Sequence, residues 1–369
     1  MKILFISRAY PPIIGGIENQ NYGIGHSLSK IAPTRVIANK SGKKNLPVFL
    51  PWVAVKALFI AGKYDVVLLG DGVLSSIGAL LKIFYPRKKI ICIIHGLDIT
   101  FARKKSLLGK IYRIINIPAL KRLDKLIMVG QETISEAVKI GISKEKCIFI
   151  PNGIDPNEIC QDCVSKDLEK LLDIDLKDKK VIFRGGRFTK HKGVEWFIRN
   201  VMPKLPENYI LVAAGAGIAK KTAGDENYYP ACKRAVADLH LENRVKLMLN
   251  LPRPDIKIIF NACDLYISPN IKIPGSMEGF GITAIEGAAC GRVVLASNLE
   301  GLKDAINDGQ NGFLLEPGNA KIWAEKIKEV LSNDSFRKEF GEKARQYTVD
   351  HYSWDKIAKK YYDVIYALS

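Results

Sequence analysis

The chain has 369 residues, 47% of them apolar, and a formal net charge of +18. This length exceeds one typical domain and the apolar fraction fills a sizeable core, which excludes a disordered chain and predicts two domains of roughly 150 to 200 residues. Residues 1–150 carry 24 Lys and Arg against 8 Asp and Glu, whereas residues 151–369 carry 32 against 30. So basic a first half is expected to meet a polyanion, either nucleic acid or an anionic membrane surface.

The start of the chain, MKILFIS, passes directly from one lysine into a strand pattern and lacks the features of a secretory signal, so we expect a cytoplasmic protein. The most apolar stretch, LPVFLPWVAVKALFIAG, contains two prolines and Lys56 and falls short of the roughly 20 clean residues of a membrane-spanning helix. We therefore expect no segment to cross a bilayer. Seven scattered cysteines fit reduced thiols, and the single CxxC at Cys160 and Cys163 lacks the further ligands of a zinc site.

Short β-rich runs alternate with longer helical patterns along the whole chain. The first half contains KILFIS, TRVIAN, YDVVLLG, KKIICIIHG, DKLIMVG and CIFIPNG, and the second half contains KKVIFRGG, YILVAAGAG, RVKLMLN, CDLYISPN, RVVLAS and GFLLEPG. Continuous apolar runs of this kind indicate strands covered on both faces, as in a parallel sheet with crossover helices. The sequence therefore predicts an α/β fold of two doubly wound, Rossmann-like domains.

The segment PNGIDPNEICQDC, residues 151–163, concentrates turn-forming residues, and the charged LEKLLDIDLKDKK follows it. We expect the boundary between residues 155 and 177, with one domain over residues 1–160 and the other over residues 177–350. The ending YSWDKIAKKYYDVIYALS has apolar residues at helical spacing and predicts an amphipathic helix over residues 352–369.

Glycines and polar residues that follow strand runs are the candidate site residues, because ligands of open parallel sheets bind beyond the carboxyl ends of the strands. Gly15 and Gly16 follow the first strand and precede a helix, where backbone amides approach a phosphate or sugar, although a simple chain reversal also uses such glycines. His95, in IIHGLD, could donate to a ligand hydroxyl or phosphate, with Asp98 orienting it or capping a helix. A buried, satisfied histidine is the alternative.

Residues 101–127, FARKKSLLGKIYRIINIPALKRLDKLI, interleave lysine and arginine with aliphatic residues. This pattern suits a helix lying on anionic lipid, and an ordinary two-faced helix is the alternative.

Two cations follow the first strand of the second domain, in FRGGRFTKHKG. Arg187 and Lys192 lie five residues apart, and such a pair suits a diphosphate and would stabilise a departing nucleoside diphosphate. A solvated basic loop is the alternative, and spacing alone does not choose among the neighbouring Arg184, Lys190 and His191.

The stretch EGFGITAIEGAACG, residues 278–291, carries two glutamates around a glycine turn. A helix is expected from Thr283 with Gly291 as its C-cap, and Glu286 stands at capping-box spacing from Thr283. Glu278 precedes the turn and has no such structural duty, so replacing it with alanine is expected to leave folding intact. It faces backbone amides that could bind a hydroxyl-rich or anionic ligand, those of Phe280, Gly281 and Ile282.

Taken in chain order, these residues resemble the retaining glycosyltransferases of family 4, which have the two-domain GT-B fold. The similarity rests on PPIIGGIE, IIHGLD, IPNGID, GRFTKHKG, EGFGITAIE with its Glu-x7-Glu spacing, and the ending YSWDKIAKKY, and so it spans nearly the whole chain. The resemblance implies an acceptor-side first domain, completed by the terminal helix, and a second domain that binds the nucleotide sugar.

The resemblance also implies roles for residues of the second domain. Arg187 and Lys192 are expected to bind the donor diphosphate, and Glu286 the ribose hydroxyls. Glu278 is expected to meet the donor sugar and the phosphate end together with the amides of Phe280, Gly281 and Ile282. Two differences from the family pattern are the turn AAGAG, residues 213–217, which lacks a usual acidic residue, and Arg184, which stands where an aliphatic residue is usual.

In the first domain, the resemblance implies that Gly15 and Gly16 close over the diphosphate and that His95 approaches the reactive side of the sugar. The implied reaction is sugar transfer with retention of configuration, assisted by the Arg187 and Lys192 cations rather than by a metal. No cofactor and no enzymatic nucleophile are expected. A lipid-linked or other glycan acceptor and an anionic membrane surface are the expected partners.

Three alternatives remain at this point. The triplet DID at residues 173–175 matches the metal-binding DxD of transferases of the other main fold, but it lies in a charged stretch before a strand. A nucleic-acid-binding protein would explain the basic half, but the sequence lacks a recognisable reading motif and the binding of nucleic acid is not expected. Another GT-B enzyme, such as a sugar-nucleotide epimerase or a phosphorylase, is the third.

Overall fold

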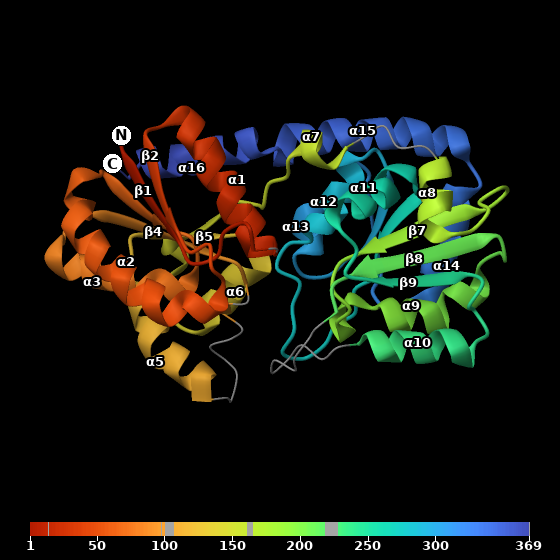
Figure 1. Ribbon diagram of the computed structural model, residues 1–369, viewed down its shortest axis with the longest axis horizontal. Coiled ribbons are helices and arrows are strands. Elements are labelled where there is room, and N and C mark those ends of the chain that lie inside the picture. Colours follow the sequence, from red (N-terminus) through yellow and green to blue (C-terminus); the bar gives the residue numbers. More distant parts are fainter. Residues whose placement is uncertain (14, 97, 100–106, 161–164, 218–227, 369) are drawn as a thin grey trace. The chain divides into compact units, whose positions relative to one another are not determined.

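A computed structural model describes residues 1–13, 15–96, 98–99, 107–160, 165–217 and 228–368 (Figure 1). The chain divides into two compact units. Unit 1 comprises Met1–Ile154 and Tyr352–Ser369, and unit 2 comprises Asp155–His351.

Unit 1 is built on a six-stranded sheet in the order β2-β1-β3-β4-β5-β6, with every neighbouring pair parallel. Its strands are β1 (Ile3–Ser7), β2 (Thr34–Ala38), β3 (Val66–Leu69), β4 (Lys89–Ile94), β5 (Lys125–Met128) and β6 (Cys147–Phe149). Its helices are α1 (Gly16–Ile31), α2 (Leu46–Ile60), α3 (Ser75–Phe84), α5 (Leu107–Arg122), α6 (Gln131–Lys139) and α16 (Trp354–Tyr366).

Helices cover both faces of this sheet, because successive residues of its strands point to opposite sides. Leu4 and Ile6 of β1 pack with α2, α3 and α5, whereas Ile3 and Phe5 pack with α1 and α16. The C-terminal helix α16 thus lies in unit 1, with Tyr361 fully buried.

Unit 2 contains a second six-stranded parallel sheet, in the order β12-β11-β10-β7-β8-β9. Its strands are β7 (Lys180–Gly185), β8 (Tyr209–Gly215), β9 (Val245–Leu249), β10 (Leu265–Ser268), β11 (Val293–Ser297) and β12 (Phe313–Leu315). Its helices are α7 (Pro156–Ile159), α8 (Ser165–Leu172), α9 (Val194–Asn200), α10 (Tyr229–Asp238), α11 (Arg253–Ala262), α12 (Ile282–Ala289), α13 (Leu302–Ala305), α14 (Ala320–Leu331) and α15 (Asp334–Tyr352). The prediction of two doubly wound parallel sheets is confirmed.

The connecting segment, residues 155–160, belongs to unit 2. Sequence analysis assigned these residues to the first domain. Ile159 is 1% exposed, and the Sγ atom of Cys160 lies 3.0 Å from the carbonyl oxygen of Ala289 in unit 2. Asp155 caps α7 by accepting hydrogen bonds from the amides of Asn157 and Glu158.

The apolar stretch around α2 forms a continuous helical segment, Lys43–Lys63, that by length and composition alone could span a membrane. One side of it packs into unit 1 through Phe49, Val53 and Ala57, which are almost completely buried. Helices in the core of soluble proteins can have the same length and apolar composition, so these two properties alone are weak evidence for a membrane span.

Candidate functional site

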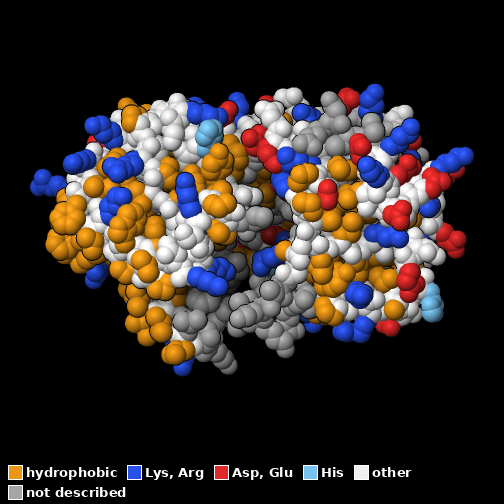
Figure 2. Space-filling view, in the orientation of Figure 1, with side chains coloured by type: hydrophobic (Ala, Val, Ile, Leu, Met, Phe, Trp, Pro, Cys, Tyr) orange, Lys and Arg blue, Asp and Glu red, His pale blue; other side chains and the backbone are white. Residues whose placement is uncertain are grey.

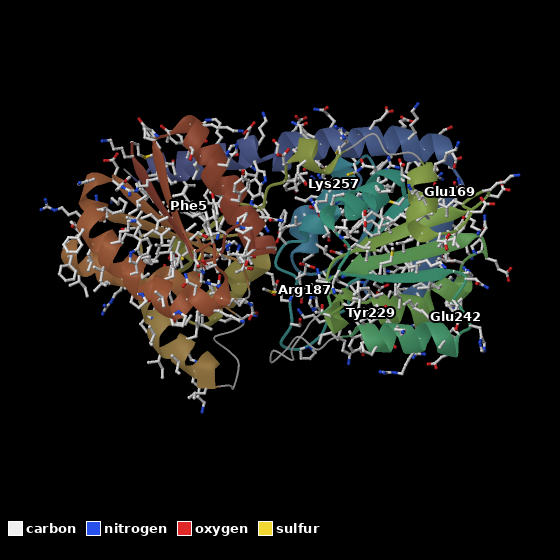
Figure 3. All side chains as sticks on the ribbon, viewed as in Figure 1. Phe5, Glu169, Arg187, Tyr229, Glu242 and Lys257 are labelled. Carbon is white, nitrogen blue, oxygen red and sulfur yellow. The ribbon has the colours of Figure 1, made fainter. Side chains whose placement is uncertain are left out.

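The strand order of unit 2 marks where a ligand is expected. The chain runs outward through β7, β8 and β9, then returns to the other side of β7 with β10, so the order reverses between β7 and β10. Ligands of open α/β sheets bind beyond the carboxyl ends of the strands at such a switch point. Arg187 follows β7 and lies at this edge of the sheet (Figure 3).

The structure brings Lys192 and Glu278 together at this edge, although 86 residues separate them. Lys192 ends the short helical turn Lys190–Lys192 after β7, and its Nζ atom forms an ion pair with Oε2 of Glu278. The next residue, Gly193, has φ 69°, and a Cβ atom there would lie 1.8 Å from the carbonyl oxygen of Pro269. Glycine at this position therefore allows the lysine turn to approach the segment after β10.

Glu278 is nearly buried and has several partners. The side-chain amide of Asn270 donates to its Oε2 at 3.1 Å, and its backbone amide donates to Glu300 at 2.7 Å. Burial alone would raise the pKa of Glu278, but the Lys192 cation and the other polar neighbours outweigh it and lower the pKa to about 2. The prediction that Glu278 has no structural duty is therefore wrong, because loss of its carboxylate would leave Lys192 buried without a counter-charge.

Glu286 lies on α12 one turn after its start, and it does not cap that helix. The helix begins at Ile282, one residue before the predicted start, and its N-cap is Gly281 with φ 97° and no side-chain hydrogen bond. Glu286 instead accepts a hydrogen bond from Nη2 of Arg253 on Oε1 at 2.7 Å. The capping-box prediction is therefore wrong. The physical reason is that a charged guanidinium is a stronger hydrogen-bond partner for a buried carboxylate than a backbone amide is.

Phe280, Gly281 and Ile282 lie at the amino end of α12, directly after Glu278. The other end of α12 has the predicted glycine stop. Gly291 has φ 69°, its amide donates to the carbonyl of Ala288, and the amide of Arg292 donates to the carbonyl of Gly287. These two bonds form the Schellman motif that commonly ends helices.

Arg253 connects Glu286 to the segment that enters unit 2. Its Nη2 atom also donates to Glu158 at 2.9 Å, and Nζ of Lys257 lies 2.6 Å from the other oxygen of Glu158. Burial raises the pKa of Glu286 and the Arg253 charge counteracts that rise. The second carboxylate oxygen of Glu286, Oε2, has no hydrogen-bond partner among the described residues and is available to a ligand.

The end of β7 and the loop after it carry one buried and one exposed arginine. Arg187 is exposed, whereas Arg184 is 2% exposed and donates to the carbonyl oxygens of Gly186 and Arg187. Arg184 therefore supports the loop from behind and does not present its charge to solvent. A Cβ atom at Gly215, the last residue of β8, would lie 1.9 Å from the carbonyl oxygen of Gly186, so glycine at this position allows the end of β8 to contact the loop after β7.

Sequence analysis missed two residues of this edge. Glu300 is 5% exposed, accepts from the amide of Glu278, and binds Nζ of Lys272 at 2.7 Å. Asn270 was likewise not assigned a role. Their position just beyond strands β11 and β10 was the available signal, because that position marks site residues in such sheets.

The triplet at residues 173–175 lies at the opposite edge of the sheet. Asp173 and Asp175 stand between α8 and the amino end of β7, and a carboxylate oxygen of Asp175 accepts from the amide of Lys177. This placement separates the triplet from Lys192 and Glu278 by the length of a strand. The DxD alternative therefore has no support from the fold.

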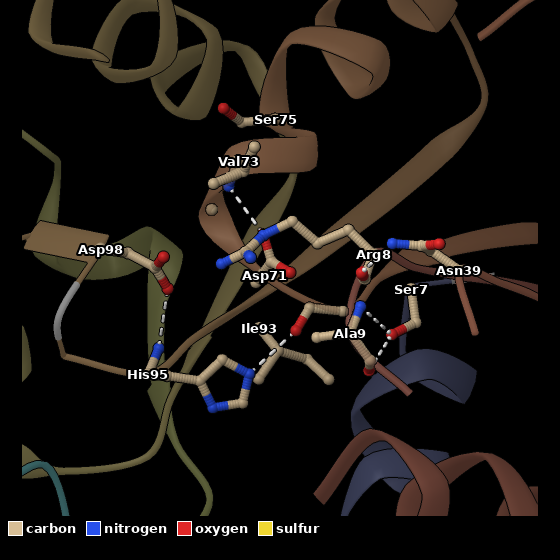
Figure 4. A network of polar contacts seen from close by, with 12 residues as sticks. Ser7, Arg8, Ala9, Asn39, Asp71, Val73, Ser75, Ile93, His95 and Asp98 are labelled. Atoms are coloured by element: carbon tan, nitrogen blue, oxygen red, sulfur yellow. Dashed lines mark hydrogen bonds and ion pairs between the residues drawn. The ribbon is translucent and has the colours of Figure 1, made fainter. Parts of the chain in front are cut away.

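A second group of polar residues lies at the carboxyl ends of β1, β3 and β4 in unit 1 (Figure 4). The Nε atom of Arg8 donates to Asp71 at 2.8 Å, and a ring nitrogen of His95 lies 2.8 Å from the carbonyl oxygen of Gly70. Asp98 accepts a hydrogen bond from the backbone amide of His95. His95 is 8% exposed, so in this structure it has the contacts of a buried, satisfied histidine.

The predicted glycine turn of unit 1 opens the first long helix. Gly15 is the N-cap of α1 and Gly16 is its first residue. The carbonyl oxygen of Gly15 accepts from the amide of Asn19, and among the residues that the structure describes no side chain caps this helix end. The amino end of α1 thus leaves helix amides available at the edge where β1 ends.

Family models match both parts of the chain. Residues 169–347 match the model described as "Glycosyl transferases group 1", and residues 18–158 match the model described as "Glycosyltransferase Family 4". Together the two matches cover most of both units.

The chain is also similar to individual proteins. It is 28% identical to an uncharacterised glycosyltransferase of Methanocaldococcus jannaschii, over 98% of this chain and 96% of that protein. It is 26% identical, over 66% of this chain and 60% of that protein, to the N,N'-diacetylbacillosaminyl-diphospho-undecaprenol alpha-1,3-N-acetylgalactosaminyltransferase of Campylobacter jejuni. Among solved structures it resembles HepE of Anabaena in complex with UDP, with a TM-score of 0.75, 20% identity and full coverage of both chains.

Proposed function

Because the chain belongs to glycosyltransferase family 4, we propose that it transfers a sugar from a nucleotide sugar to a hydroxyl of a lipid-linked or cell-envelope glycan, with retention of configuration and without a metal. The observation that carries this proposal is the ion pair of Lys192 and Glu278 at the switch point of unit 2, beside the amino end of α12. The fold of the chain is that of GT-B enzymes, as the similarity to the Anabaena structure indicates.

The site residues divide the work on the donor. The cations Arg187 and Lys192 would bind the diphosphate and stabilise the charge that develops when the sugar leaves. The amino end of α12 adds a favourable partial charge for the same group. The free Oε2 of Glu286 would accept hydrogen bonds from the ribose hydroxyls.

Glu278 is proposed to orient the donor sugar and to hold Lys192. We assign it no nucleophilic role, because its Oε2 already binds Lys192 and Asn270. With two cations at the leaving group, the charge that a metal would otherwise neutralise is compensated by the chain itself. The roles of Gly15, Gly16 and His95 stay predictions.

An exposed apolar surface in unit 1 supports a membrane-embedded acceptor. Among the described side chains of α2 and α5, eight large apolar ones are exposed, with Phe59 79% and Ile114 73% exposed. Figure 2 shows hydrophobic side chains gathered on the surface of unit 1. We call these residues the apolar face: Val48, Trp52, Val55, Phe59, Leu107, Ile111, Ile114 and Ile115. The predicted basic segment corresponds to α5 from residue 107 onward, and residues 101–106 lie outside the described residues.

Charge favours an anionic lipid surface as the partner of the apolar face. Lys110, Lys121 and Arg122 of α5 are exposed beside it, and Nζ of Lys56 lies 4.4 Å from the ring centre of Trp52. Apolar side chains flanked by lysine and arginine bind the interface of anionic membranes. We accordingly propose a cytoplasmic protein that associates peripherally with the membrane.

Flotation with phosphatidylglycerol vesicles at low and moderate salt tests this association. We expect binding that falls when Phe59 and Ile114 are both replaced by serine, and no change when Ile322, an exposed apolar residue of α14 in unit 2, is replaced in the same way. Absence of binding at both salt concentrations, or dimerisation through this face instead, would contradict the proposal.

The reaction itself is tested by product analysis. Thermal-shift screening against UDP, ADP and GDP identifies the nucleotide, and the matching nucleotide sugars are then incubated with vesicles containing a polyprenyl-diphosphate-linked sugar. We expect release of the nucleoside diphosphate, a glycosylated lipid whose NMR spectrum shows the anomeric configuration of the donor, and full activity in EDTA. A product with inverted configuration would overturn the retaining mechanism. Loss of activity in EDTA that manganese restores would overturn metal independence, and an epimerised donor without transfer would overturn the transferase activity.

A further inference from the structure

Two cysteine side chains meet where the connecting segment contacts α12. Cys160 follows α7 and Cys290 follows α12, and their Sγ atoms are 3.9 Å apart. Cys290 is 5% exposed, whereas Cys160 is partly exposed. One accessible thiol thus lies beside one buried thiol within the distance of a sulfur hydrogen bond.

The surroundings of Cys160 favour its thiolate. The hydrogen-bond contact with the Cys290 thiol, together with the nearby cations of Arg345 and Arg292, lowers the pKa of Cys160 to about 7 although partial burial opposes this. The same contact with Cys160 raises the pKa of Cys290. Cysteines with this asymmetry act as an attacking thiolate and a resolving thiol in disulfide exchange.

A cavity of mixed charge adjoins these residues. It has a volume of about 330 Å³, and its lining carries the cations of Arg292, Arg337, Lys338 and Arg345 and the carboxylates of Asp264, Asp334 and Glu342. Nη1 of Arg345 also donates to the carbonyl oxygen of Ala289, the atom that lies 3.0 Å from Sγ of Cys160. The two cations that act on Cys160, those of Arg345 and Arg292, can pair with the carboxylates of small anionic disulfides.

We propose that Cys160 and Cys290 form a thiol modification site that reacts with small anionic disulfides and closes to an intramolecular disulfide. The Cys160 thiolate attacks one sulfur of the reagent disulfide and expels one thiolate, which gives a mixed disulfide. The Cys290 thiol then loses its proton and attacks the Cys160 sulfur, which expels the second thiolate. Two protein thiols are oxidised to one disulfide, and one reagent disulfide is reduced to two thiols that take up the protons.

The closed disulfide would join the end of α7 to the end of α12. Glu286 lies in α12, one turn before Cys290, which follows the helix. To form the disulfide, the Sγ atoms of Cys160 and Cys290 must approach from 3.9 Å to about 2 Å. We therefore expect oxidation to reduce donor binding severalfold and reductant to restore it. This consequence rests on the proposed function, whereas the thiol chemistry does not.

Treatment of the full chain with oxidised glutathione, followed by peptide mass spectrometry, tests the site. We expect one disulfide between the peptides of Cys160 and Cys290, a trapped glutathione adduct on Cys160 in Cys290→Ser, and neither product in Cys160→Ser. Cys163→Ser should behave like the unchanged chain. Labelling by iodoacetamide at pH 7 should be about tenfold faster at Cys160 than at Cys147, whose pKa is raised by burial.

Three results would overturn the proposal. They are a Cys160–Cys163 disulfide in place of the Cys160–Cys290 one, equal labelling rates at Cys160 and Cys147, and an adduct on Cys160 that Cys290 does not resolve. If the disulfide forms but donor binding is unchanged, the link to Glu286 is refuted while the modification site stands. If no nucleotide binds in either redox state, the proposed function fails instead.

Discussion

Replacing Arg253 with methionine is expected to make donor binding sensitive to acid. Arg253 is the cation that compensates the buried carboxylate of Glu286, through a hydrogen bond of 2.7 Å. Without it, burial raises the pKa of Glu286 unopposed, and the carboxyl group becomes protonated at a higher pH. A protonated carboxyl loses acceptor capacity for the ribose hydroxyls, so donor affinity should fall as the pH is lowered.

The size of the effect follows from the exposure of the two side chains. A hydrogen bond between charged groups contributes about 1.5 to 3 kcal/mol. The Arg253 side chain is 41% exposed and that of Glu286 is 12% exposed, so the lower end applies. About 1.4 kcal/mol corresponds to one pH unit and to a tenfold change in an equilibrium constant. We therefore expect the acid limb of kcat/KM for the donor to move up by about one pH unit.

The assay is the pH profile of donor kcat/KM, measured alongside kcat. Arg253→Lys keeps a positive charge and should retain most of the original profile. Glu158→Gln is the second control: it removes a negative charge that raises the pKa of Glu286, so the acid limb should not move up. A uniform loss at every pH in Arg253→Met, with an unmoved profile, would refute the reasoning and indicate a direct or purely structural contact.

Three further predictions concern neighbouring residues. Glu278→Ala should lower the free energy of unfolding by about 3 kcal/mol in urea titrations, because it leaves Lys192 buried and unpaired, and stable protein in this variant would contradict the ion pair. Since the pKa of Glu278 is lowered from 4.5 to about 2, its contribution to stability should be present above pH 4.5 and disappear toward pH 2. Glu300→Gln should reduce transfer about tenfold by loosening the amide of Glu278, whereas Lys272→Gln, at a side chain 63% exposed, should have little effect on initial rates. Arg184→Met should weaken binding of the nucleoside diphosphate more than that of the nucleoside in calorimetry, with a small change in Tm, and equal weakening of both would argue against support of the loop.

The fold could be predicted from the sequence because its signals are local. Most strands are built on runs of three or more apolar residues, such as IICII in β4, and helices cover both faces of the sheet of unit 1. The end of α12 was also predictable, because helices often end at a glycine in the left-handed conformation. Gly291 follows the helix in the sequence, and in the structure it has φ 69°.

The pairings within the site could not be predicted, because they join residues that are distant in sequence. Lys192 and Glu278 are 86 residues apart, and Arg253 and Glu286 are 33 apart. From the local sequence pattern, Glu286 was predicted to cap its own helix and Glu278 was predicted to have no structural partner. In the folded protein both carboxylates have low exposure and therefore need a cationic partner. The partner is Lys192, which follows β7, for Glu278, and Arg253, which follows β9, for Glu286.

These ion pairs bear on how a donor is bound. Lys192 is nearly buried and already compensated by Glu278, so in the proposed reaction a diphosphate would have to share this lysine with a carboxylate. Glu278 keeps its bonds to Asn270 and through its own amide to Glu300, so it need not leave when the anion enters. In the proposed reaction, exposed Arg187 would meet the diphosphate first, and the lysine would strengthen its contact as negative charge grows on the departing group. Contacts that strengthen in this way favour the transition state over the bound donor, which is the condition for catalysis.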